Sequence, residues 1–168
     1  MRTEPTAEPS SRGLVFLDFD GVLHPIKAGG KRLVKLPVFE HWLQARPSID
    51  LVFSTSWREQ HSVEALAAFL SPDLRRRCLG ATPMLHRVFG PTWSRTPKEM
   101  HFGRYERQAE IELWFKEHPA KGAWAAIDDM PELFEPECSW LVTCDASVGL
   151  TSLDLNRLDQ MLGLAKGP

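Results

Sequence analysis

Two carboxylates, one residue apart, directly follow an apolar run near the start of the chain. Residues 14–17 read Leu-Val-Phe-Leu, and Asp18 and Asp20 come next with one phenylalanine between them. Such a run is typical of a parallel strand buried on both faces, whose carboxyl end is where open α/β sheets bind ligands. Side-chain alternation places both carboxylates on one side of the strand, unless the chain turns first, and two like charges there need a cation or a proton. Asp18 and Asp20 are therefore candidate catalytic and metal-binding residues, the alternative being a turn or a helix cap.

A second acidic pair ends another apolar run. Residues 123–127 are Ala-Trp-Ala-Ala-Ile, and Asp128 and Asp129 follow them. If the two runs are strands of one parallel sheet, their acidic ends converge into an oxygen-rich cage. Such a cage suits Mg²⁺, which keeps several waters and shares the phosphate oxygens of a substrate.

A cluster of hydroxyl groups follows a third apolar run. Residues 49–53 form the run, Ser54 and Thr55 come next, and Arg58 lies three positions further on. Hydroxyl and backbone N–H donors at a helix start, next to a guanidinium group, are suited to binding phosphate. An ordinary N-cap explains the hydroxyls equally well, and Ser56 is a competing candidate for the ligand hydroxyl.

One basic residue lies on the inward face of a predicted helix. The apolar spacing within residues 111–115 predicts a helix over residues 105–117. Arg107 lies on the same face, one turn nearer the helix start, which approaches the carboxyl edge of the sheet when the helix connects two parallel strands. Arg107 is therefore the candidate cation for the site, with Arg104 as the alternate and an exposed helix cation as the competing interpretation.

The order of these residues along the chain resembles the four motifs of the haloacid dehalogenase (HAD) superfamily of phosphohydrolases. A D-x-D pair comes first, then a hydroxyl, then a basic residue and last a second acidic pair. The resemblance implies that Asp18 attacks phosphorus and that Asp20 is the general acid and base. It also implies a bound Mg²⁺. The expected metal ligands are Asp18, Asp20 through its backbone carbonyl, Asp128 and Asp129, and the expected phosphate-binding residues are Ser54, Thr55, Arg58 and Arg107.

Four shorter segments are more specific. They resemble the small capless HAD-like domains of RNA repair proteins of the Swiss Army Knife type, and more distantly the 3′-phosphatase half of polynucleotide kinases. The segments are S-T-S-W-R at 54–58, R-Q-A-E-I-E-L-W-F at 107–115, I-D-D at 127–129 and V-G-L-T at 148–151.

The expected architecture is a three-layer, Rossmann-like (HAD-like) α/β fold, with a parallel sheet and helices on both of its faces. The interval between Asp20 and Ser54 is too short for a strand, a helix and a folded cap, so a flap hairpin over the site and no cap domain are expected. Residues 83–103 are expected to be irregular. The predicted strands are 14–17, 49–53, 78–82, 123–127 and 140–145, and the predicted helices are 38–45, 63–70, 105–117 and 153–164.

Composition fits one soluble domain. The chain has 168 residues, 43% of them hydrophobic, which predicts a single domain over 13–168 after a disordered tail over 1–12. The net charge of −2 predicts no polyanion partner by itself, but residues 21–39 and 74–98 contain basic residues and no acid. Three cysteines match no zinc pattern and cannot all pair, which favours reduced thiols and a cytoplasmic protein. No membrane span is expected, and a monomer is favoured.

The expected function is that of a Mg²⁺-dependent phosphomonoesterase with an aspartyl-phosphate intermediate. Receiver-like phosphoacceptor or binding domains are the competing class, but they carry the acidic pair on the first strand and the phosphorylated aspartate later. The missing cap favours a large substrate such as a nucleic-acid end, and a nucleotide or sugar phosphate is the alternative. The basic residues that can follow a single strand are Lys27, Lys31, Arg32, Lys35, Arg87 and Arg95.

Overall fold

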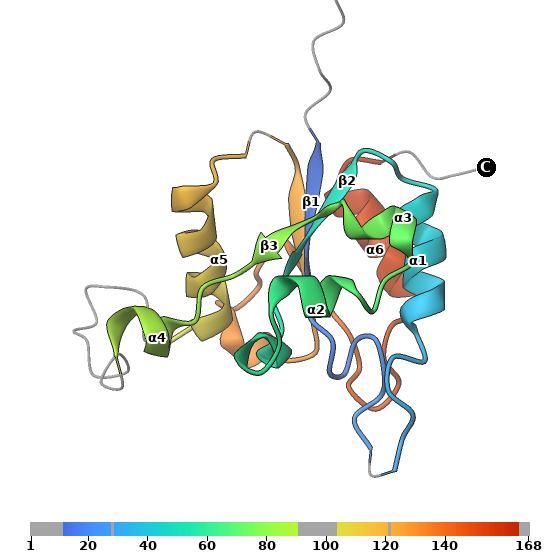
Figure 1. Cartoon of the computed structure of the whole chain (residues 1–168), viewed down its shortest axis with the longest axis horizontal. Coiled ribbons are helices and arrows are strands. Elements are labelled where there is room, and N and C mark those ends of the chain that lie inside the picture. The colour runs from blue at the N-terminus through green and yellow to red at the C-terminus, as the bar shows by residue number, and fades with distance from the viewer. Residues whose placement is uncertain (1–11, 28, 91–103, 121, 165–168) are drawn as a thin grey trace, which may run out of the picture.

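A five-stranded parallel sheet forms the centre of the computed structural model, which describes residues 12–27, 29–90, 104–120 and 122–164. The strand order is β3-β2-β1-β4-β5, so the chain fills one side of β1 first and the other side later (Figure 1). The direction changes between β1 and β4, which is where open α/β sheets bind ligands. The strands are β1 (Gly13–Leu17), β2 (Ile49–Phe53), β3 (Cys78–Ala81), β4 (Trp124–Asp128) and β5 (Leu141–Thr143). The predicted fold class is confirmed.

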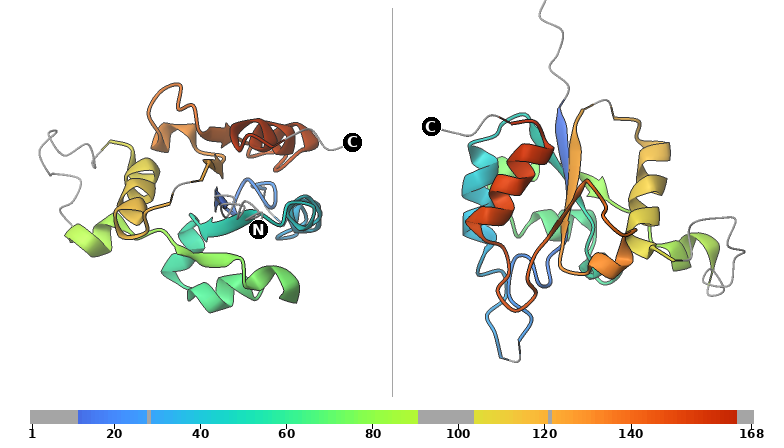
Figure 2. Two further views of the ribbon diagram at one scale, coloured as in Figure 1. Left: turned by 90° about the horizontal axis from the view of Figure 1, so that it is seen from above. Right: turned by 180° about the vertical axis from the view of Figure 1, so that it is seen from behind.

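Side chains of the central strands alternate between two apolar cores. In β1, Val15 and Leu17 pack on the side of α1 (Leu36–Gln44) and α6 (Ser152–Met161). Leu14 and Phe16 pack on the opposite side with Ile111 and Trp114 of α5 (Glu106–Glu117). Figure 2 shows the resulting three layers, with the sheet between α5 and the pair formed by α1 and α6. Both faces of the three central strands are therefore buried, as their apolar sequences require.

Short helices occupy the connections around β3. They are η1 (Ser56–Glu59), α2 (Val63–Ala67), α3 (Pro72–Arg75) and α4 (Leu85–Phe89). A further short helix, η4 (Pro131–Leu133), follows β4. The predicted helix over 63–70 thus ends earlier, and α3 was not predicted. The expectation that 83–103 is irregular is wrong for α4, a helix too short to show a period, which ends where Gly90 adopts a φ of 77°. Residues 91–103 lie outside the described part of the chain.

The connection after β1 is the predicted excursion over the carboxyl edge of the sheet. Its two limbs are joined where Lys35 N donates to Leu23 O at 2.8 Å. Leu150 N donates to Val22 O at 2.8 Å, and a Cβ on Gly149 would lie 3.0 Å from the same oxygen. The V-G-L-T segment therefore supports the base of the excursion. Within the described residues this loop consists of turns and irregular segments without a strand, and no cap domain lies between β1 and β2.

Arg12 is the first described residue, although the sequence assigns it to the disordered tail. Its guanidinium binds both carboxylate oxygens of Asp50, at 2.5 and 2.6 Å, beside the start of β2. This bidentate pair fixes the start of β1 against its neighbour.

Candidate active site

The ends of β1, β2 and β4 place three polar residues side by side. Asp18 N donates to Ile127 O at 3.1 Å and Ser54 N donates to Leu17 O at 2.9 Å, which continues the parallel ladder beyond the strands. Each polar residue lies two positions after a residue of the core on the α5 side, so alternation directs all three towards α5. These three residues at the strand ends are Asp18, Ser54 and Asp128.

Three carboxylates form the candidate metal centre. One oxygen each of Asp18, Asp128 and Asp129 lies within 4.8 Å of the others. Gly21 makes this approach possible, because a Cβ there would lie 2.3 Å from the carboxyl carbon of Asp129. Gly21 also has a φ of 69°, which residues with a side chain rarely adopt. The glycine after the D-x-D pair is therefore required both by the turn and by the neighbouring carboxylate.

The electrostatics of this cluster fit a divalent cation. Burial raises the pKa of Asp18 well above its usual range, and the charge of Asp128 adds to that increase. Burial also raises the pKa of Asp128 to about 6, and it raises the pKa of Asp129. Removing these carboxylates from water is unfavourable without a neutralising charge, and an all-oxygen donor set suits Mg²⁺. The residues present therefore fit the ion that the sequence predicts.

Arg107 extends from the first turn of α5 into the same cluster. Its Nη1 lies 3.6 Å from Asp18 Oδ1, and its Nε lies 3.8 Å from Asp128 Oδ2. Burial lowers the pKa of Arg107, but the charges of Asp128 and Asp18 outweigh it and the net shift is upwards. Nη1 is buried and has no hydrogen-bond partner, and neither has the buried Oγ of Ser54. Two buried donors without partners on one face of the sheet edge can together bind an anionic oxygen group.

The alternates named for these two positions lie elsewhere. Ser56 is exposed at the start of η1, whereas Ser54 is buried at the strand end. The side chain of Arg104 is exposed, and its guanidinium lies 5.6 Å from the ring centre of Tyr105. The geometry therefore brings Ser54 and Arg107 to the carboxylates.

Thr55 and Arg58 have structural partners. Thr55 Oγ1 accepts a hydrogen bond from Trp57 N at 3.3 Å and so acts as the N-cap of η1. Arg58 donates from Nη1 to Thr55 O at 2.5 Å and forms a buried ion pair with Glu110 through Nη2. Only its Nε is buried without a partner. Glu110 had no predicted role, although its position on α5, three residues after Arg107, was a signal for one.

The carboxylate of Asp20 lies outside the three-carboxylate cluster and has partners of its own. Its Oδ2 accepts a hydrogen bond from Trp57 Nε1 at 2.9 Å, and its Oδ1 lies 3.1 Å from His24 Nε2. The alternation expected of the D-x-D pair ends with β1 at Leu17, and the chain turns over residues 21–23, so the two carboxylates have different partners. Its side chain is not in the three-carboxylate cluster, and the metal ligand expected of Asp20, its backbone carbonyl, stays a prediction. Neither Trp57 nor His24 was predicted, although Trp57 belongs to the S-T-S-W-R segment that carries the resemblance.

A comparison with family models gives one match. A model for the HAD domain in Swiss Army Knife RNA repair proteins matches residues 14–155, which include every candidate site residue described above. No similarity to a curated protein or to a solved structure was found. None of the helices in the described part of the chain is long and apolar enough to span a membrane.

Proposed function

The chain belongs to the family of HAD domains of Swiss Army Knife RNA repair proteins, and from this premise we propose that it is a Mg²⁺-dependent phosphomonoesterase. The observation that carries the proposal is the position of Arg107. Its buried Nη1 lies 3.6 Å from Asp18 Oδ1 and has no hydrogen-bond partner. A carboxylate nucleophile beside an unused guanidinium donor is suited to attack on a bound phosphoryl group.

In the first half-reaction, Asp18 attacks phosphorus and the bond to the leaving oxygen breaks. Arg107 and Ser54 hold the equatorial oxygens of the phosphoryl group and stabilise the charge spread over them. Asp20 gives its proton to the leaving alkoxide, which departs as an alcohol. Mg²⁺, held by Asp18, Asp128, Asp129 and the Asp20 carbonyl, would neutralise the repulsion between nucleophile and phosphate.

In the second half-reaction, Asp20 acts as a base. It removes a proton from the water that attacks the phosphorus of phosphorylated Asp18. The bond between phosphorus and the Asp18 oxygen breaks, inorganic phosphate leaves, and Asp20 is protonated for the next cycle. The exposure of Asp20 supports this role, because its half-exposed side chain is accessible to the attacking water.

For the substrate we favour the terminal phosphate of a nucleic acid. The open edge without a cap and the exposed basic side chains of Lys27, Lys31 and Arg32 on the loop above it support this choice. A nucleotide or sugar phosphate is the second candidate. The three cysteines are unpaired, which agrees with action in the reducing cytoplasm. We expect the chain to work as a monomer.

An assay on an aryl phosphate with and without Mg²⁺ tests the proposed activity. We expect release of phosphate that depends on Mg²⁺ and is lost in Asp18→Asn. The competing function is a phosphoacceptor domain that uses the same aspartate as a switch. Uptake of one phosphoryl group from acetyl phosphate without steady release of phosphate would support that function and contradict a phosphatase.

A further inference from the structure

Asp20 forms part of the wall of a cavity. This cavity measures about 310 Å³ and is also lined by Arg32, Trp57 and His61. In the proposed reaction Asp20 gives its proton to the leaving oxygen, so the leaving oxygen must lie within hydrogen-bond reach of Asp20. The remainder of the leaving group must then begin in this cavity.

Arg32 is the basic residue of this cavity wall. Its guanidinium carbon lies 5.2 Å from the ring centre of Trp57, a geometry that gives a cation–π attraction. The same indole donates its N–H to Asp20. Arg32 forms no ion pair with any described carboxylate, so its charge is available to a ligand. Trp57 thus links the proposed proton donor to an unpaired guanidinium in one cavity.

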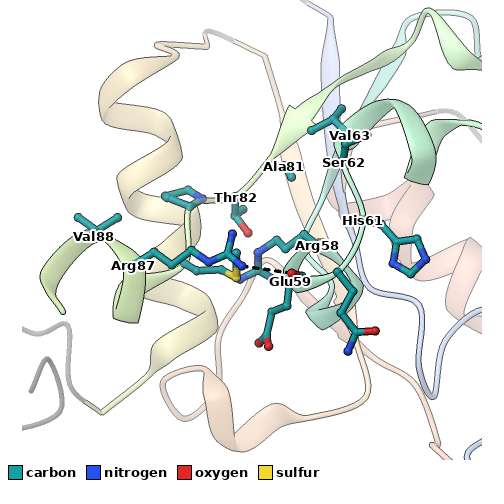
Figure 3. Close-up of a pocket in the computed structure, with 12 residues that line it drawn as sticks. Arg58, Glu59, His61, Ser62, Val63, Ala81, Thr82, Arg87 and Val88 are labelled. Carbon is teal, nitrogen blue, oxygen red and sulfur yellow. Dashed lines mark hydrogen bonds between the residues drawn. The ribbon is translucent and has the colours of Figure 1, made fainter. Parts of the chain in front are cut away.

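A larger cavity of about 630 Å³ adjoins the first. Both are lined by Glu59, Gln60 and His61, so they share one wall along η1 and the residues that follow it. Figure 3 shows the larger cavity, with Arg87 directed from α4 towards Glu59, whose backbone oxygen accepts its hydrogen bond at 3.1 Å. A leaving group that extends along these shared residues would reach the larger cavity. Glu59 contributes a carboxylate to the wall of the cavity beside Asp20, and Arg32 contributes the guanidinium that can bind an anion there.

We propose that the cavity beside Asp20 is the leaving-group subsite and that Arg32 selects phosphomonoesters whose leaving group carries a second anionic group. This inference rests on the proposed phosphatase function. The second anion is the terminal phosphate of a small bisphosphate or a phosphodiester of a nucleic-acid strand. Both offer the same charged oxygens to a guanidinium fork.

Three substrates separate these sources. They are adenosine 3′-monophosphate, whose leaving group is neutral, adenosine 3′,5′-bisphosphate, and a trinucleotide with a 3′-phosphate and a 5′-hydroxyl. The measured quantity is the ratio of kcat/KM for each of the last two substrates to kcat/KM for the first. We expect Arg32→Gln to lower at least one ratio by about 10- to 100-fold, as for the loss of a hydrogen-bonded charge pair. Loss confined to the bisphosphate indicates a small substrate, and loss confined to the trinucleotide indicates a strand.

Two further variants provide the controls. Arg76→Gln removes an exposed arginine that ends α3, before β3 begins and hence away from the carboxyl edge, and both ratios should stay within about twofold of the wild type. Lys31→Gln removes the neighbouring charge of the same loop, outside the cavity wall. If Lys31→Gln lowers the ratios as much as Arg32→Gln, diffuse loop charge is responsible and the assignment of Arg32 is wrong.

A binding measurement separates this inference from the proposed activity. Calorimetric titration of Asp18→Asn with adenosine 3′,5′-bisphosphate and with the trinucleotide needs no turnover. If the wild type hydrolyses nothing but Arg32→Gln weakens binding in this background, anion binding by Arg32 stands, whereas the phosphatase proposal and the leaving-group assignment fail. If hydrolysis occurs but neither the ratios nor binding depend on Arg32, the subsite assignment is overturned while the activity stands.

Discussion

Trp57 Nε1 donates a hydrogen bond of 2.9 Å to Asp20 Oδ2 across the carboxyl edge of the sheet. The indole is held by edge-on contacts with Phe19 and Phe69, at ring-centre distances of 5.2 and 5.6 Å. Because aromatic packing fixes the indole, the hydrogen bond fixes the direction of the Asp20 carboxyl group. Trp57 is therefore a positioning residue for the proposed proton donor.

Trp57→Phe removes this N–H and keeps an aromatic ring in the core. We expect roughly a tenfold slower first half-reaction with alkyl phosphates, whose leaving oxygen needs a proton, and at most about a twofold change with aryl phosphates. Single-turnover kinetics with both substrates measure the difference. Equal slowing of the two reactions would mean that Trp57 supports the fold rather than the direction of Asp20.

Arg107→Gln should weaken binding of inorganic phosphate by about 10- to 100-fold, because it removes a buried charged donor beside Asp18. Competitive inhibition by phosphate measures this change. Arg104→Gln, from an exposed position just before the same helix, is the matched control and should leave inhibition unchanged. If the two variants weaken inhibition equally, the cation of the site has been assigned to the wrong residue.

Gly21→Ala and Gly29→Ala form a matched pair, because both glycines have a φ of 69°. A Cβ at Gly21 would lie 2.3 Å from Asp129, whereas nothing lies within 4 Å of a Cβ at Gly29. Both variants should lose about 1–2 kcal/mol of stability from the backbone alone. Only Gly21→Ala should also lose the increase in Tm produced by Mg²⁺. An unchanged Mg²⁺ response in Gly21→Ala would exclude Asp129 from the metal centre.

The stability of the metal-free protein should fall as pH rises through the titration of Asp128. The pKa of Asp128 is raised from 3.8 to about 6, so the folded protein binds this proton more tightly than the unfolded chain does. Its stabilising contribution is complete below about pH 4 and is lost as pH rises through about 6. Asp128→Asn lacks this titration. The free energy of unfolding of the wild type should therefore fall relative to that of Asp128→Asn as pH rises between these values.

Denaturant unfolding of both proteins without metal measures that difference. Adding Mg²⁺ at pH 7 should restore the stability of the wild type and have a smaller effect on Asp128→Asn. A difference between the two proteins that does not change with pH would show that Asp128 titrates alike in the folded and unfolded states.

The sequence predicts the parts of the site that depend on strand and helix periods. Asp18 and Ser54 each follow a buried strand and Asp128 ends one, and parallel pairing alone brings the strand ends together. Arg107 follows from helical spacing on α5. These residues could be predicted because their positions depend on local patterns that repeat along the chain.

The side-chain pairs that complete the site could not be predicted in this way. Trp57 and Asp20 are far apart in sequence and meet only after the loop beyond β1 has turned, and Arg58 and Glu110 form their ion pair between η1 and α5. Such contacts depend on the angle at which each chain segment leaves the sheet. That angle is set by tertiary packing rather than by a repeating pattern.

The most direct test of the account is the chemical identity of the phosphorylated residue. In Asp20→Asn, an aryl phosphate needs no proton to depart, but hydrolysis of the intermediate lacks its base, so the phosphorylated protein should accumulate. Borohydride reduction followed by mass spectrometry converts a phosphorylated aspartate into homoserine and locates it in the chain. We expect homoserine at position 18 in the presence of substrate and Mg²⁺, and none when Asp18→Asn is added to the variant. Turnover of the aryl phosphate by the wild type without any label at Asp18 would contradict the account.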